Sequence, residues 1–272
     1  DFDLDGFRCD YAAGIPRDFW ESLRPELDRV RPGIAFLAES DDPTFLRSAF
    51  DVDYAWDFYH ALSDAMEGRA PAALVRTTWE SAQAKYPRGA LRLRFSDNHD
   101  QLRATGRAGL PAALAASALI FTLDGVPLLY NGMEVGDTVE STAPALFERD
   151  PIQWNMAERR PHVEGFYKSL ISLRRAHPAL TRGEVRWLKN ADEQRVLSYE
   201  RSSGGESLVV VVNLSSSPFE GRVEVAAGRF QDITPNWQTQ TPVTPAKAVQ
   251  RASLPAVSLA PWEVRVFKRE TP

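Results

Sequence analysis

Ile34-Ala35-Phe36-Leu37-Ala38 is a run of apolar residues that ends at Glu39. A strand with apolar residues on both faces is typical of a parallel sheet, because such a sheet is covered on both sides. Similar short runs occur at Gly6–Cys9, Leu91–Phe95 and Val126–Tyr130. We therefore predict at least four parallel strands in the first part of the chain.

Helical patterns alternate with these predicted strands. The apolar residues of 16–30 recur at helical spacing, and proline stops the last pattern at His177-Pro178. The predicted helices are Pro16–Val30, Tyr54–Met66, Pro71–Ala84, Leu110–Phe121 and Phe166–Ala176. This alternation indicates an α/β fold over residues 1–180.

From about Thr181 the pattern changes to strands separated by turn residues. Ser202-Ser203-Gly204-Gly205 and Ser215-Ser216-Ser217-Pro218 are the clearest turns. The predicted strands are Val196–Tyr199, Leu208–Asn213 and Val264–Lys268. We expect residues 181–272 to form an all-β domain, an antiparallel sandwich.

Composition limits the possible partners. The chain has 272 residues, 43% of them hydrophobic, and its net charge of −5 comes from 37 acids and 32 bases without a basic run. A nucleic-acid partner is therefore not expected. Cys9 is the single cysteine, so a cysteine-based zinc cluster is excluded. The longest apolar stretch, Leu110–Leu123, is shorter than the roughly 18–20 residues that cross a bilayer, so no membrane partner is expected.

The first chemical signal is Gly6-Phe7-Arg8-Cys9-Asp10. Arg8 and Asp10 are two residues apart on a strand and so lie on the same face. A guanidinium lowers the pKa of a neighbouring carboxyl group and keeps it ionised, as a nucleophile requires. An ordinary ion pair at the end of a strand is the alternative interpretation.

The second signal is Glu39, at the carboxyl end of the predicted strand 34–38. Apolar surroundings raise the pKa of a glutamate and let it deliver a proton to a leaving oxygen. Glu39-Ser40-Asp41-Asp42-Pro43 also resembles the start of a helix, so helix capping is the alternative.

The third signal is Ser96-Asp97-Asn98-His99-Asp100, after the predicted strand 91–95. These polar residues could cap a loop, contact sugar hydroxyls or bind a metal, and metal ranks last because the chain has only four histidines. In parallel barrels, catalytic residues come from the carboxyl ends of successive strands. Three consecutive predicted strands lead into an acid here, and two carboxylates on adjacent strands can flank a glycosidic bond.

These segments together resemble the alpha-amylase family of glycoside hydrolases, family thirteen. Residues 6–10 resemble the family's strand-four motif, Glu39 the strand-five acid/base, and residues 95–100 the strand-seven motif ending in Asn-His-Asp. Residues 125–134 resemble the strand-eight segment, with its Gly-x-Pro, Tyr and Gly-x-Glu landmarks. All four occur in the family's order.

The resemblance implies a role for each residue. Asp10 would be the nucleophile, Glu39 the acid/base, and Asp100 the third catalytic acid, which holds sugar hydroxyls. The residues expected to bind substrate are Arg8, His99, Asn98 and Tyr11. The reaction would retain the α configuration and need no redox cofactor, with calcium possible in the full-length enzyme and an α-linked oligosaccharide or polysaccharide as substrate.

Two departures from the family accompany the resemblance. Many members carry a histidine four residues after the nucleophile, where this chain has Gly14, so a sugar contact or calcium tie through that position is in doubt. The strand-three motif is absent, and we expect the chain to cover strands four to eight of a TIM barrel and the C-terminal domain. Such a fragment is expected to be inactive alone and to self-associate through open barrel edges.

Other functions are weighed against this one. A transglycosylase of the same family would use the same carboxylates. A non-catalytic scaffold relative would not need Asp10, Glu39 and Asp100, and a free-standing carbohydrate-binding module would explain only the β domain. Tyr54, Trp56, Phe58 and Tyr59 could stack on sugars, although their helical spacing favours core packing.

Overall fold

The structure is a computed structural model that describes residues 3–138, 151–235 and 250–270. Its first part contains a five-stranded parallel sheet in the order β1-β2-β3-β4-β5. The strands are β1 (Gly6–Cys9), β2 (Ala35–Ala38), β3 (Val52–Tyr54), β4 (Leu91–Arg94) and β5 (Val126–Pro127). The four predicted strands are confirmed. Strands β1, β2 and β4 agree with their predicted bounds to within one residue, whereas β5 covers only the first two residues of the predicted strand 126–130.

Strand β3 was not predicted. It lies between β2 and β4, so the prediction that the strands leading to Glu39 and Asp100 are consecutive is wrong. Residues 52–54 form only three positions of strand, and the central one is Asp53, which is fully buried. A short strand with a charged central residue gives no apolar run, which is why the sequence pattern missed it.

The helices follow the predicted alternation, with shifted ends. Helix α2 begins at Trp56 rather than at Tyr54, and α7 begins four residues before the predicted start. Pro178 ends α7 as predicted but also starts α8, because proline fits the first turn of a helix. The helices are α1 (Arg17–Val30), α2 (Trp56–Met66), α3 (Ala73–Lys85), α4 (Ala104–Ala108), α5 (Leu110–Thr122), α6 (Met156–Arg159), α7 (His162–Ala176) and α8 (Pro178–Arg182).

None of the helices in the described ranges has the length and apolar character needed to span a membrane.

The second part of the chain forms two antiparallel sheets. The larger has the order β11-β10-β13-β8-β7-β6, and the smaller pairs β12 with β9. Val209 and Val211 of β8 pack with Phe219 of β9 and Val257 of β12 between the two sheets. The strands are β6 (Glu184–Trp187), β7 (Val196–Ser203), β8 (Glu206–Asn213), β9 (Phe219–Arg222), β10 (Gly228–Asp232), β11 (Gln250–Leu254), β12 (Ala256–Leu259) and β13 (Val264–Arg269).

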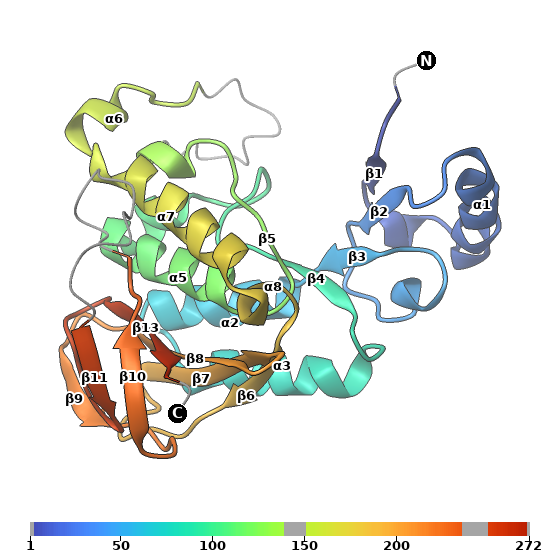
Figure 1. Ribbon diagram of the computed structural model, residues 1–272. Coiled ribbons are helices and arrows are strands. Elements are labelled where there is room, and N and C mark those ends of the chain that lie inside the picture. Colours follow the sequence, from blue (N-terminus) through green and yellow to red (C-terminus); the bar gives the residue numbers. More distant parts are fainter. Residues whose placement is uncertain (1–2, 139–150, 236–249, 271–272) are drawn as a thin grey trace.

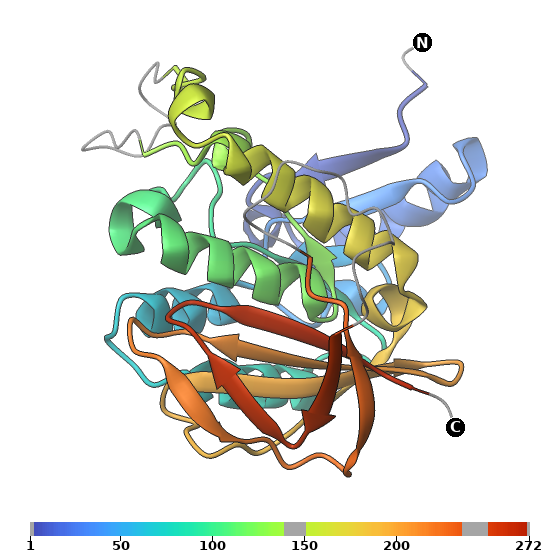
Figure 2. The same ribbon diagram turned by 60° about the vertical axis from the view of Figure 1, so that its left-hand side comes forward.

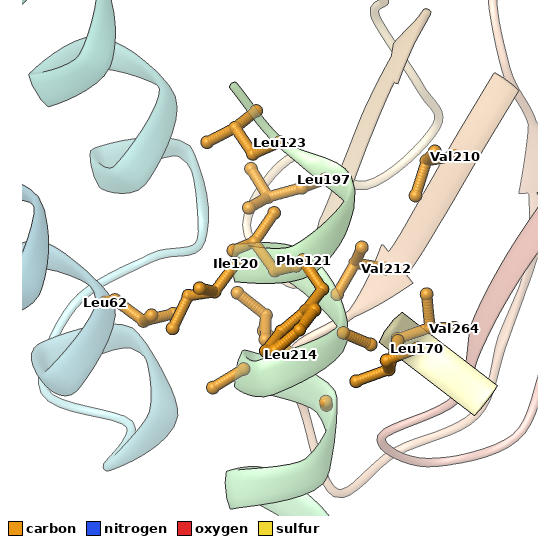
Figure 3. Packing of buried hydrophobic residues seen from close by; sticks show 14 of the residues in the cluster. Leu62, Ile120, Phe121, Leu123, Leu170, Leu197, Val210, Val212, Leu214 and Val264 are labelled. Carbon is orange, nitrogen blue, oxygen red and sulfur yellow. The ribbon is translucent and has the colours of Figure 1, made fainter. Parts of the chain in front are cut away.

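Helix α5, which lies beneath α7 in Figure 1, contacts α2 and β5 of the first part of the chain and β8 and β13 of the antiparallel part. It is apolar on all sides, and ten of its thirteen residues are buried, as expected for a helix enclosed in a core. Leu62 of α2 lies on one side of α5, and Val210, Val212 and Val264 of the antiparallel sheet lie on the other (Figure 3). Figure 2 shows the antiparallel strands stacked against the helices. One hydrophobic core therefore joins both parts.

Polar contacts secure the carboxyl end of α5. The last carbonyl groups of a helix lack partners within the helix. Arg174 of α7 donates to the carbonyl oxygens of Phe121 and Leu123 at 2.8 and 2.9 Å. Arg201 of β7 donates to the carbonyl of Thr122 at 2.6 Å, and the Tyr199 hydroxyl lies 2.7 Å from the Thr122 hydroxyl.

The antiparallel part also caps the start of α3. The backbone N–H groups of Ala72 and Ala73 donate to the carbonyl oxygens of Gln194 and Glu193, at 2.8 and 3.0 Å. Arg76 of α3 forms an ion pair with the Glu193 side chain at 3.0 Å. The turn between β6 and β7 thus supplies the hydrogen-bond acceptors that α3 needs at its amino end.

We predict that Arg201→Met destabilises the protein strongly. Arg201 is fully buried, and the change leaves the carbonyl groups of Thr122 and Gly183 unpaired. Hydrogen bonds of charged groups contribute about 1.5–3 kcal/mol each, so the free energy of unfolding should fall by about 2–4 kcal/mol in urea titration. The control Arg186→Met, at a side chain 63% exposed, should cost less than about 1 kcal/mol. Equal losses would contradict the assignment.

Candidate active site

Arg8 brings the first two predicted catalytic acids together. Strands β1 and β2 run parallel with Cys9 opposite Ala38, so Asp10 and Glu39 follow at the same edge of the sheet. One amino group of Arg8, Nη1, forms an ion pair with Asp10, and the other, Nη2, lies 3.0 Å from Oε1 of Glu39. Two carboxylates from different strands therefore share one guanidinium.

Glu39 is held at both of its carboxylate oxygens. Arg8 contacts Oε1, and the backbone N–H of Tyr11 donates to Oε2 at 2.7 Å. The side chain of Glu39 is only 18% exposed, whereas that of Asp10 is 80% exposed. Glu39 does not cap a helix in the described residues, so the alternative interpretation of a helix cap is wrong. Arg8 and Asp10 do form the ion pair of the alternative interpretation, and the role of Asp10 as nucleophile stays a prediction.

Tyr54 supports Arg8 from the end of β3. Nε of Arg8 donates to the Tyr54 hydroxyl at 3.4 Å, and the guanidinium lies 5.7 Å from the centre of the Tyr54 ring. Burial acts to lower the pKa of Arg8, but its hydrogen bonds with Tyr54 and Asp10 raise it overall, which keeps the guanidinium charged. Sequence reasoning missed this role because it assigned Tyr54 to a helix.

The polar loop after β4 contains two acids, of which Asp97 is buried and Asp100 is partly exposed. Asp97 is buried, accepts hydrogen bonds from the Ala104 N–H at 2.9 Å and the Ser96 hydroxyl at 2.7 Å, and so fixes the start of α4. Burial raises the pKa of Asp97. Asp100 lies 3.3 Å from Nε2 of His99, and both side chains are partly exposed.

Asn98 shapes this loop. Its side chain is buried, and its Oδ1 accepts the backbone N–H of Asp100 at 3.0 Å. No hydrogen bond or ion pair joins Asp100 to Asp10 or Glu39 within residues 3–138. Since β1, β2 and β4 are parallel, all three acids follow the carboxyl edge of one sheet. The binding of substrate by Asn98 and His99 stays a prediction.

The aromatic residues of 54–59 form a packed cluster. Tyr54, Phe58 and Tyr59 are buried, and the rings of Tyr54 and Trp56 lie 5.5 and 5.0 Å from that of Phe95. Core packing, rather than stacking on sugars, is therefore the main role of these buried rings. The hydroxyl of Tyr59 donates to Gln101 at 2.9 Å and so ties the cluster to the loop that carries Asp100.

Asp53, the central residue of β3, is an acid that takes no part in this site. It pairs with Arg92 at 3.0 Å, and Arg92 also contacts Asp57 of α2 at 2.9 Å. Both residues of the Asp53–Arg92 pair are buried. Burial raises the pKa of Asp53 to about 6, although Arg92 acts in the opposite direction.

Comparison with known proteins finds many relatives, although no model of a protein family matches the chain. The chain is 30% identical over 225 residues to the alpha-amylase MalA of Haloarcula japonica, which covers 79% of this chain and 32% of MalA. It is 27% identical over 234 residues to a cyclomaltodextrinase of Geobacillus thermopakistaniensis, covering 81% of this chain and 38% of that protein. The chain thus spans about a third of the length of these curated relatives.

Comparison with solved structures also finds enzymes that act on α-glucans or their oligosaccharides. The maltogenic alpha-amylase AmyB of Thermotoga neapolitana matches 100% of this chain over 63% of its own, with a TM-score of 0.83 and 24% identity. A cyclic alpha-maltosyl-(1→6)-maltose hydrolase of Arthrobacter globiformis matches 98% of this chain over 56% of its own, with a TM-score of 0.77 and 23% identity. The parallel sheet and the antiparallel part therefore match part of the fold of alpha-amylase TIM-barrel enzymes.

We predict that Asp53→Asn changes how stability depends on pH. The folded-state pKa of about 6 lies above the value of about 3.9 in an unfolded chain, so the folded state binds this proton more tightly. Stability should therefore fall by about 2–3 kcal/mol as pH rises from about 4 to about 6.5. Urea unfolding across this range should show that Asp53→Asn removes the fall, whereas Asp28→Asn on α1 keeps it. An unchanged slope in Asp53→Asn would contradict the raised pKa of Asp53.

Proposed function

This chain belongs to the alpha-amylase family of glycoside hydrolases, and from that premise we propose that it carries the catalytic carboxylates of an enzyme that cleaves α-glucosidic bonds. The observation that carries the proposal is the bridge of Arg8 between Asp10 and Glu39. The names of its relatives, amylases and cyclomaltodextrinases, point to α-glucans and their oligosaccharides as the substrate class.

The proposed reaction proceeds in two displacements. Asp10 attacks the anomeric carbon, while Glu39 gives its proton to the glycosidic oxygen and the bond from that oxygen to the anomeric carbon breaks. Glu39, now a carboxylate, takes a proton from water, and the water oxygen attacks the same carbon and displaces Asp10. Two inversions leave the α configuration unchanged.

The surrounding groups position the two acids, although Glu39 contacts the Arg8 guanidinium instead of the apolar surroundings expected from the sequence. Arg8 fixes the direction of the Asp10 side chain, because it binds both Asp10 and Tyr54. The Tyr11 N–H and Arg8 fix Glu39 beside Asp10. In this proposal Asp100 and His99, which contact each other at 3.3 Å, hold sugar hydroxyls at the same edge of the sheet.

We propose that the parallel sheet represents strands four to eight of an eight-stranded barrel. The order β1-β2-β3-β4-β5 gives one strand to each of the five positions, with β3 as strand six between the acid/base strand and the strand-seven motif. The two functional regions would then be 1–180, the barrel part, and 181–272, the β-sandwich part. The shared core around α5 supports a fixed arrangement of the two.

We predict that Asp10→Asn and Glu39→Gln each abolish activity in the full-length protein. Asp10→Asn removes the nucleophile and Glu39→Gln removes the proton donor, and both keep the shape of the side chain. Because catalytic residues of one site act together, losing either one should cost most of the activity. Turnover of maltooligosaccharides should fall by about four orders of magnitude or more. The controls Asp28→Asn and Glu21→Gln on α1 should keep wild-type rates. Near-normal turnover in Glu39→Gln would require another acid.

We also predict that residues 1–272 expressed alone do not hydrolyse α-glucosides. In the described sheet, β1 and β5 each have a neighbouring strand on one side only, and such edges expose unpaired backbone groups. We expect self-association through these edges, measured as mass in solution, and no activity beside the full-length protein. A monomer with full activity would contradict this prediction.

A further inference from the structure

Tyr11 is an exposed aromatic residue directly after the proposed nucleophile. Tyr11 is 71% exposed, which makes it one of the most exposed large apolar residues in the described ranges. Its backbone is left-handed, with φ 41° and ψ 50°, a conformation that non-glycine residues rarely adopt. Such an arrangement is strained and persists only with support from its surroundings.

The surroundings of Tyr11 provide that support. The backbone N–H of Gly14 donates to the carbonyl of Tyr11 at 2.8 Å, and Trp20 of α1 donates to the carbonyl of the buried Ala12 at 3.0 Å. The Tyr11 ring lies against Gly14, where an added Cβ would come within 2.4 Å of two ring carbons. Gly14 therefore provides the space in which the ring rests.

The contact between Tyr11 and Glu39 indicates which part of a bound substrate would lie near Tyr11. The Tyr11 N–H donates to Oε2 of Glu39 at 2.7 Å, so the residue stands beside the proposed proton donor. In the proposed reaction, that proton goes to the oxygen of the leaving sugar. With its backbone beside the proton donor and its ring exposed, Tyr11 is placed to contact the leaving sugar rather than the core of the protein.

Building on the proposed function, we infer that Tyr11, seated on Gly14, is a stacking platform for the leaving sugar and sets the preference for substrates with a sugar as leaving group. The apolar C–H face of a glucose unit would lie on the ring, and the ring's position would depend on the missing side chain at residue 14. Fluoride as leaving group would make no such contact and would not need this platform.

The test compares two leaving groups in the full-length protein. The probes are maltotriose, whose leaving group is a sugar, and α-maltosyl fluoride, whose leaving group is fluoride. In Tyr11→Ala, kcat/KM for maltotriose divided by kcat/KM for the fluoride should fall at least tenfold. Alanine, like tyrosine, carries a Cβ atom in the left-handed backbone conformation. The change in the ratio therefore measures the loss of the aromatic ring.

Three further variants make the test specific. Tyr11→Phe keeps the ring and should keep the ratio within about twofold of wild type. Gly14→Ala displaces the ring and should lower the ratio in the same direction as Tyr11→Ala. Phe19→Ala removes an exposed aromatic of α1 and should leave the ratio unchanged.

The outcomes separate this inference from the proposed function. An active wild type whose ratio stays the same in Tyr11→Ala and in Gly14→Ala would overturn the platform and leave the proposed function standing. A wild type that cleaves neither probe would overturn both. A tenfold loss in Tyr11→Phe as well as in Tyr11→Ala would also overturn the platform, because the hydroxyl rather than the ring face would then be responsible.

Discussion

The rest of the structure depends on the buried carboxyl end of helix α5. Arg174 and Arg201 satisfy the carbonyl groups there, and both come from elements that follow much later in the chain. Asp124, just beyond the helix, binds Arg94 of β4 through its side chain and its carbonyl, each at 2.9 Å. The antiparallel part, α7 and strand β4 of the parallel sheet therefore meet at one point. An unpaired carbonyl in this setting would cost about as much as a lost hydrogen bond, which makes the junction cooperative.

The candidate site joins two packing units. Asp10 and Glu39 directly follow β1 and β2, which pack with α1 in a cluster that includes Trp20, Phe36 and Phe50. Asp100 follows β4, which is tied to the end of α5. Tyr54 connects the units, because its hydroxyl meets Arg8 and its ring contacts Phe95 at the base of the Asp100 loop. Figure 1 shows α1 and β1 on one side of the molecule and α5 with the antiparallel strands on the other, with β3 and β4 between them. The relative position of the acids thus depends on a strand that the sequence pattern did not reveal.

Residue patterns predicted the structural features that depend on residues close together in the sequence. Apolar runs located β1, β2 and β4, and the two-residue spacing placed Arg8 and Asp10 on one face. The missed features depend on contacts far along the chain. Asp53 is tolerated inside β3 only because Arg92, on the next strand, pairs with it. Two other contacts likewise depend on three-dimensional packing. They are the ion pair of Arg8 with Glu39 and the contact of the Tyr11 ring with Gly14. Asp97, one of the two acids noted in its loop, caps α4, a role that its sequence position did not distinguish from that of Asp100.

The most direct test of the account is to trap the covalent intermediate that it assigns to Asp10. A 5-fluorinated α-glucosyl fluoride loads a retaining α-glycosidase quickly and leaves it slowly, so the sugar stays on the nucleophile. After proteolysis of the full-length protein, mass spectrometry should find one fluoroglucosyl unit on the peptide that contains Asp10, and none in Asp10→Asn. A label on Glu39 or on another carboxylate, or rapid turnover of the reagent with an unlabelled Asp10 peptide, would contradict the assignment.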